Sequence, residues 1–166
     1  LLLPSTIFQK GFVMKRPVDV VIIGSGSAGL SALRQVKKYT DNYILINHGP
    51  LGTTCARVGC MPSKMLIHMA GTCHKSRLLS EKGFFEKGRV SPDIPAVMKH
   101  VRKLRDFFAG GMRQDTLELA DGKLVEGRAE ILGPESVKVG NEAFTASKII
   151  VAAGSSPIIP ENWEGF

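Results

Sequence analysis

The sequence has little of what several broad classes of protein require. It contains three cysteines in 166 residues, an odd and small number that does not fit a scaffold of structural disulfides. No apolar stretch is long enough to cross a bilayer, and the apolar start lacks the features of a secretory signal. Only 7% of the residues are aromatic, and they are not interleaved with arginines, which argues against dedicated nucleic-acid binding despite a net charge of +7.

The first half of the chain carries the pattern of a β-α-β unit. Residues 18–23 form a β-branched apolar run, which is typical of a strand buried on both faces of a parallel sheet. A glycine-rich loop over 24–29 follows at once, and helical spacing continues over 30–39. A second short apolar run at 43–46 predicts the next strand of an α/β fold.

The rest of the chain predicts two helices and a group of short strands. One helix is expected over 62–79, with Pro62 in its first turn. A second begins near residues 92–95 and runs through Phe108, before Gly110 and Gly111 disturb it. The predicted strands lie at 123–125, 129–132, 136–139, 143–146 and 148–152.

The loop GSGSAG matches the dinucleotide-binding pattern G-x-G-x-x-G in its required place, between a buried strand and a helix. Gly24 permits the tight turn, Gly26 lets the backbone approach a pyrophosphate, and Gly29 allows close packing of the helix on the strand. The alternative is a glycine-rich turn without a ligand. Asn47 stands where an acidic residue usually accepts hydrogen bonds from ribose, and a neutral amide there predicts reduced affinity.

A second motif, GTTCARVGCMPSK, places two cysteines five positions apart and a lysine four positions after the second. In a regular helix the Cα atoms of Cys55 and Cys60 would be about 8.6 Å apart, whereas a disulfide needs less than about 7 Å. The backbone between them must therefore be distorted, and Gly59 supplies the freedom. Two unrelated buried cysteines would leave this pattern unexplained. A zinc site would need a second ligand pair, and Cys73 with His74 fits no usual spacing, so we expect no metal.

This second motif resembles the redox-active disulfide signature of the class I pyridine nucleotide-disulfide oxidoreductases. That family includes dihydrolipoamide dehydrogenase, glutathione reductase and mercuric reductase. The resemblance extends from Val18 to Pro157 through the glycine loop, the thiol motif, GRAEI and KIIVAAGSSP. The chain departs from the family pattern at Asn47, at Thr53 in place of a glycine and at Ala153 in place of a threonine, which together suggest a divergent member.

The resemblance implies that the dinucleotide is FAD and assigns roles to individual residues. Cys55 would exchange with the disulfide substrate, Cys60 would lie against the flavin, and Lys64 would place a positive charge near flavin N5. The other positions expected to contact the cofactor are Gly24, Gly26, Ser27, Ala28, Gly29, Asn47, Thr54, Ala129 and Gly154.

The resulting prediction is the first part of an α/β Rossmann-like FAD-binding domain, with a parallel sheet, helices and a small antiparallel β-meander. We expect it to span 18–154, after an extension over 1–17 and before a linker over 155–166. The family's NAD(P) fingerprint and catalytic histidine are not found in the sequence, so we expect a fragment of a longer protein that is inactive alone.

The resemblance predicts electron transfer between a small-molecule or lipoyl-type dithiol, the Cys55 and Cys60 pair, FAD and NAD(P), most like dihydrolipoamide dehydrogenase. The full-length protein is expected to be a cytoplasmic homodimer without nucleic-acid or membrane partners. A glutathione or mercuric reductase-like member is the alternative within the family. A non-catalytic dinucleotide-binding module is the alternative outside it.

Overall fold

The computed structural model describes residues 13–15, 17–84 and 91–163. Within them the chain forms two compact units. The first combines the described residues up to Pro50 with those from Leu119 onward, and the second is Leu51–Glu118. Most of the predicted extension over 1–17 and the end of the predicted linker lie outside the described residues.

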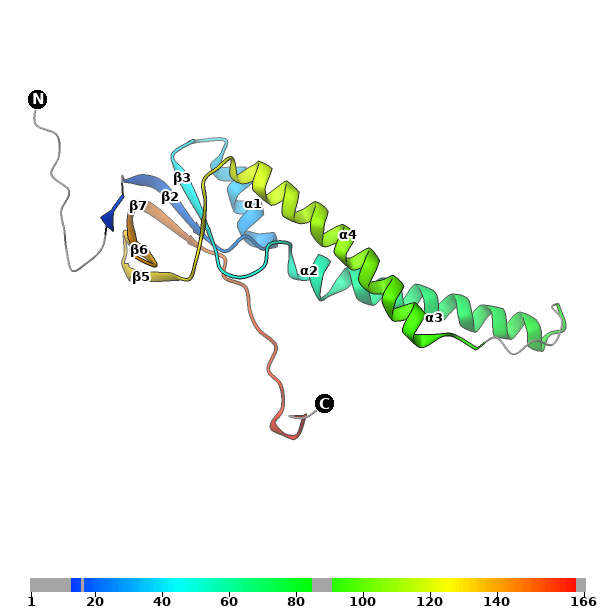
Figure 1. Ribbon diagram of the computed structural model, residues 1–166. Coiled ribbons are helices and arrows are strands. Elements are labelled where there is room, and N and C mark those ends of the chain that lie inside the picture. The colour runs from blue at the N-terminus through cyan, green and yellow to red at the C-terminus, as the bar shows by residue number, and fades with distance from the viewer. Residues whose placement is uncertain (1–12, 16, 85–90, 164–166) are drawn as a thin grey trace, which may run out of the picture. The chain divides into compact units, whose positions relative to one another are not determined.

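The first unit is built on a mixed sheet with the strand order β4-β3-β2-β7-β6-β5 (Figure 1). Its described strands are β1 (Val13–Met14), β2 (Val18–Ile23), β3 (Tyr43–Asn47), β4 (Leu124–Glu126), β5 (Ala129–Gly133), β6 (Ser136–Val139) and β7 (Glu142–Val151). β2, β3 and β4 run parallel, whereas β5, β6 and the first half of β7 form an antiparallel meander. Helix α1 (Ser27–Val36) connects β2 to β3. The predicted α/β fold and meander are therefore confirmed.

The prediction of two separate strands at 143–146 and 148–152 is wrong, because β7 is one continuous strand of 10 residues. Its residues 142–145 pair antiparallel with β6, and from Ala146 onward it pairs parallel with β2. The strand changes partner without leaving the extended conformation. The sequence pattern is interrupted near residue 147, but the backbone is not. β1 pairs parallel with the start of β7.

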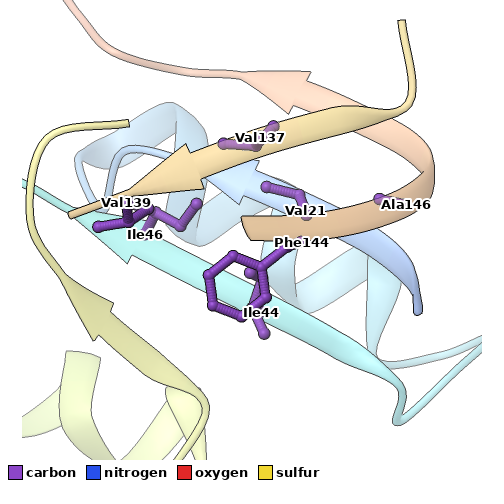
Figure 2. Close-up of a cluster of buried hydrophobic side chains, with 7 residues drawn as sticks. All are labelled: Val21, Ile44, Ile46, Val137, Val139, Phe144 and Ala146. Carbon is purple, nitrogen blue, oxygen red and sulfur yellow. The ribbon is translucent and has the colours of Figure 1, made fainter. Parts of the chain in front are cut away.

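The core of the first unit lies between the parallel strands and the meander. Figure 2 shows seven buried side chains from β2, β3, β6 and β7 that form one cluster: Val21, Ile44, Ile46, Val137, Val139, Phe144 and Ala146. The side chains of the cluster are at most 8% exposed. α1 contributes a separate buried stripe of Gly29, Leu30, Leu33 and Val36, the spacing of an amphipathic helix. This packing holds the carboxyl ends of β2 and β3 together, where the glycine loop begins.

The second unit is helical. It contains α2 (Thr54–Arg57), α3 (Cys60–Glu81) and most of α4 (Ile94–Ala120). α4 starts as predicted, since Asp93 Oδ1 accepts a hydrogen bond of 3.1 Å from the backbone N–H of Ala96. It does not break at Gly110 and Gly111, which corrects the prediction. Two helical glycines cost about 1 kcal/mol each, and a helix of 27 residues carries them without interruption.

Candidate dinucleotide and thiol sites

The glycine loop after β2 is closely packed at its first and last glycines. Gly24 has a φ of +107°, and a Cβ atom there would lie 2.2 Å from the backbone oxygen of Ala152. A Cβ atom at Gly29 would lie 1.8 Å from the backbone oxygen of Gly24. The Gly24 N–H also donates to the Ile46 oxygen at 2.8 Å. The two glycines therefore let the loop fit against β3 and the end of β7.

Gly26 differs from its two neighbours in the motif. A Cβ atom there would meet no atom within 4 Å, and its φ of −74° is open to any residue. Gly26 is the N-cap of α1, and no side chain caps the helix start. The first turn of α1 includes Ser27 and Ala28 and contains no acidic residue. The open face at Gly26 and the helix start thus fit an anionic group such as a pyrophosphate.

Asn47 lies at the end of β3 beside this loop and is already hydrogen bonded within the chain. Its Oδ1 accepts a hydrogen bond of 2.6 Å from Ser25 Oγ, and its Nδ2 donates to the backbone oxygen of Gly49 at 2.7 Å. Ser25 and Asn47 are both buried. The predicted contact between Asn47 and ribose stays a prediction.

The two cysteines of the second motif flank a break between α2 and α3. Cys55 is the second residue of α2, and Cys60 is the first residue of α3. Gly59, at φ −120° and ψ −114°, separates the helices, and its Cβ position lies 3.2 Å from the Thr54 oxygen. The predicted distortion of the backbone is therefore confirmed. Ser63 Oγ donates to the Gly59 oxygen at 2.9 Å, which holds the first turn of α3 against the break.

The two cysteines lie close together at this break, since the Cβ position of Gly59, the residue before Cys60, is 3.5 Å from the Cα atom of Cys55. All three cysteines, Cys55, Cys60 and Cys73, are free thiols in the structure. A side-chain hydrogen bond between Cys55 and Cys60 raises the pKa of Cys55, and desolvation adds to the increase. The backbone N–H of Cys60 and the positive charge of Lys64 act in the opposite direction on that pKa, with a smaller effect. The arrangement holds the proton on Cys55, which therefore needs a base to become a nucleophile.

Alkylation rates should reveal this raised pKa. In reduced protein, iodoacetamide is expected to modify Cys55 more slowly than an ordinary cysteine at pH 7.5, because less of it is thiolate. Cys60→Ala removes the largest cause of the raised pKa and should accelerate the modification of Cys55, whereas Lys64→Gln should slow it. Peptide mass spectrometry measures each rate. Equal rates for Cys55 in all three proteins would contradict the proposed coupling.

The raised pKa also has a consequence for stability. Because the pKa of Cys55 is higher in the folded protein than in the unfolded chain, the protonated thiol stabilises the fold at a pH below the unfolded-state pKa. This stabilisation is lost as the pH rises through the pKa that Cys55 has in the folded protein. The free energy of unfolding should therefore fall more steeply with alkaline pH in the reduced native sequence than in Cys55→Ser, as urea titrations at several pH values can measure.

The predicted site residues are divided between the two units. The first unit contains Gly24, Gly26, Ser27, Ala28, Gly29, Asn47, Ala129 and Gly154, and the second contains Thr54, Cys55, Cys60 and Lys64. Ala129 begins β5, whereas Gly154 follows β7 with a φ of +74°. Lys64 lies one turn after Cys60 on α3, on the same side of the helix.

Two residues of these sites do not stand out from the sequence motifs. Ser25 is a variable position of the glycine motif, and only its contact with Asn47 reveals a role. Thr53 is the N-cap of α2, and its Oγ1 accepts a hydrogen bond of 3.3 Å from the N–H of Ala56. A threonine before a short helix is a recognised capping signal, so Thr53 could have been interpreted as more than a substituted glycine.

Two further features are absent from the described residues. No cluster of three or more His, Cys, Asp or Glu side chains within them could hold a metal ion. None of the described helices combines the length and the apolar character needed to cross a membrane.

Comparison with known proteins relates the chain to one family. The model of the family described as pyridine nucleotide-disulphide oxidoreductase matches residues 18–166. A dihydrolipoyl dehydrogenase from Vibrio cholerae is 33% identical over 145 residues, which is 84% of this chain and 30% of the relative. A glutathione reductase from Nostoc sp. is 30% identical over 148 residues, which is 86% of this chain and 31% of the relative.

More distant relatives extend the same picture. A mercuric reductase from Lysinibacillus sphaericus is 27% identical and is matched over 26% of its length. The structure of the HOCl-induced flavoprotein disulfide reductase RclA from Escherichia coli, in its Cu(II) complex, superimposes with a TM-score of 0.66 at 22% identity. The match covers 89% of this chain and 31% of RclA, and it supports the fold. This chain thus spans about a third or less of the length of these proteins.

Proposed function

The chain belongs to the pyridine nucleotide-disulphide oxidoreductase family, and we propose that it is the thiol- and FAD-binding part of a flavin-dependent disulfide oxidoreductase. Electrons would pass between a dithiol or disulfide substrate, the Cys55 and Cys60 pair, FAD and NAD(P). The observation that carries the proposal is the close packing at the break between the two cysteines: the Cβ position of Gly59, the residue before Cys60, is 3.5 Å from the Cα atom of Cys55. Two cysteines brought together in this way would form one disulfide by giving up two protons and passing two electrons to FAD.

FAD fits the open side of the glycine loop. Gly26 would provide the close approach to its pyrophosphate, while Gly24 and Gly29 let the loop pack against the chain. The N–H groups at the start of α1 would donate to the pyrophosphate. When bound, FAD would accept and donate electron pairs, and it would in this way link the thiol pair to the nicotinamide. Ala129, Gly154 and Thr54 are proposed as further contacts on the basis of the family pattern.

Within the thiol site, the chain's own residues have distinct proposed roles. Cys55 keeps its proton until a base removes it and then exchanges with the substrate. Cys60 then forms the disulfide with Cys55 and releases the substrate thiol. Lys64 adds positive charge that favours thiolate at Cys55 and is proposed to favour the reduced flavin in the same way.

The substrate is proposed to be a small or lipoyl-type dithiol, as for a dihydrolipoyl dehydrogenase. Relatives named dihydrolipoyl dehydrogenase, glutathione reductase and mercuric reductase match at 33%, 30% and 27% identity, so the latter two activities are the alternatives. We further propose that the whole protein is a cytoplasmic homodimer. Rates with lipoamide, glutathione disulfide and Hg(II), measured with NADH or NADPH, distinguish the three activities.

The proposal predicts that oxidised protein contains a disulfide between Cys55 and Cys60 and leaves Cys73 free. Treatment with a mild thiol oxidant, followed by alkylation, should modify one cysteine before reduction and three after it. Mass spectrometry identifies the modified peptides. Cys73→Ser is the matched control and should retain the reducible pair.

A disulfide that includes Cys73 would contradict this assignment. Failure of Cys55 and Cys60 to pair under any oxidant would favour the remaining alternative, a dinucleotide-binding module without redox activity.

A further inference from the structure

A buried network of polar groups connects the end of β3 to the glycine loop. Ser25 Oγ donates to Asn47 Oδ1 at 2.6 Å, and Asn47 Nδ2 donates to the Gly49 oxygen at 2.7 Å. Ser25 is 4% exposed and Asn47 is 9% exposed. Buried hydrogen bonds of this kind constrain the groups that they join, because an unpaired partner would lose its contacts with water.

The network requires the amide of Asn47 in one orientation. The backbone oxygen of Gly49 can only accept, so Asn47 must present its NH2 group there and its oxygen to Ser25. An ionised aspartate could still accept from Ser25, but it would place a carboxylate oxygen against the Gly49 oxygen. The asparagine is therefore matched to these two partners in a way that the acidic residue of the dinucleotide pattern is not.

The main chain holds both ends of this network. The backbone oxygen of Asn47 accepts a hydrogen bond of 2.8 Å from the Gly127 N–H, and the Gly24 N–H donates to Ile46 at 2.8 Å. Ser25 lies between Gly24 and Gly26, the N-cap of α1. A fixed Ser25 side chain thus restricts the backbone of the loop directly beside the proposed pyrophosphate site.

We infer that Asn47 is a positioning residue, which holds the glycine loop through Ser25 in the conformation that binds the dinucleotide. Its Oδ1 serves the loop instead of a ribose hydroxyl, so this chain replaces an acidic ligand contact with a neutral internal one. The inference rests on the proposed function, since it concerns how the same FAD site is formed.

The inference and a ribose contact predict opposite effects of Asn47→Asp. If Asn47 were a ribose ligand, a carboxylate would bind the hydroxyl more strongly, and FAD affinity would be equal or higher. If Asn47 positions the loop, the carboxylate loses the donor to Gly49, and FAD affinity at pH 7.5 should fall about tenfold. Ser25→Ala should have an effect of similar size, because it removes the other end of the network.

The test is a double-mutant cycle on the complete chain with FAD as the probe. FAD is titrated into ¹⁵N-labelled Ser25→Ala, Asn47→Ala, the double variant and Asn47→Asp, and amide shifts report weak as well as tight binding. The double variant should bind FAD no more weakly than Asn47→Ala alone, because the two residues act as one unit. Asn141→Asp is the matched control, since Asn141 is exposed in a turn, and it should not change the affinity.

Unfolding in urea is measured on the same proteins to separate positioning from general stability. Additive effects, unchanged FAD affinity despite lower stability, or an Asn47→Asp protein that binds FAD at least as well as the unsubstituted chain would each overturn the inference. The expected loss of FAD affinity in the variants, together with failure of Cys55 and Cys60 to pair on oxidation, would count against the proposed redox function only. No FAD binding by the unsubstituted chain would overturn both.

Discussion

Gly29→Ala is expected to lower the free energy of unfolding of the first unit by more than about 3 kcal/mol. The new methyl group would lie 1.8 Å from the backbone oxygen of Gly24. Neither partner is a flexible side chain, so the clash can be relieved only by moving the loop or α1, and Gly29 lies in the buried stripe of that helix. Urea unfolding followed by circular dichroism measures the loss.

Gly26→Ala is the informative comparison, because it separates stability from binding at the same motif. Its methyl group would meet no atom within 4 Å, so stability should change by no more than about 1 kcal/mol, the cost of alanine at an N-cap. FAD affinity should nevertheless fall about tenfold or more, since the methyl group occupies the side from which a pyrophosphate approaches.

Gly71→Ala in α3 controls for the substitution itself. Its Cβ position is also open, and alanine in a helix interior should be stabilising by about 0.5–1 kcal/mol. If Gly29→Ala proved as stable as the unsubstituted chain, the close packing of the glycine loop would be incorrect. Unchanged FAD affinity in Gly26→Ala would contradict the proposed position of the pyrophosphate.

Cys60→Ser in the FAD-bound protein is expected to abolish the long-wavelength absorption band that a thiolate in contact with flavin produces on partial reduction. Cys55→Ser should keep or strengthen the band. The two thiols have different proposed partners: Cys60, the first residue of α3, would lie against the flavin, and Cys55 would exchange with the substrate. Cys55 instead has a raised pKa and holds its proton. Absorption spectra recorded during reductive titration provide the measurement.

Both cysteine variants should lose the internal disulfide and therefore turnover, because either one removes a sulfur from the pair; a remaining single thiol can at most form a mixed disulfide with the substrate. Cys73→Ser again serves as the matched control and should keep both the band and the pair. Equal spectra for Cys55→Ser and Cys60→Ser would contradict the division of roles, although the disulfide itself would still be supported by the alkylation result.

Local patterns predicted the β-α-β unit because its determinants are local. The β-branched run of β2 and the glycines of the loop specify their backbone conformations within a few residues. β2 was predicted with its observed bounds, and β3 differed by one residue. The end of α4 and the continuity of β7 were missed for the opposite reason. Gly110 and Gly111 are tolerated by the length of their helix, and β7 continues because β2 and β6 provide hydrogen-bonding partners to its two halves.

The sequence by itself determined which residues can form the thiol site, because the spacing from Cys55 to Cys60 is incompatible with a regular helix and Gly59 lies between them. Only the tertiary structure decided what Asn47 contacts. Its partners Ser25 and Gly49 lie 22 residues before it and 2 after it, and the first comes within reach only when β2 and β3 pair in register. A hydrogen bond between residues so far apart in the chain depends on that pairing, which no local pattern contains.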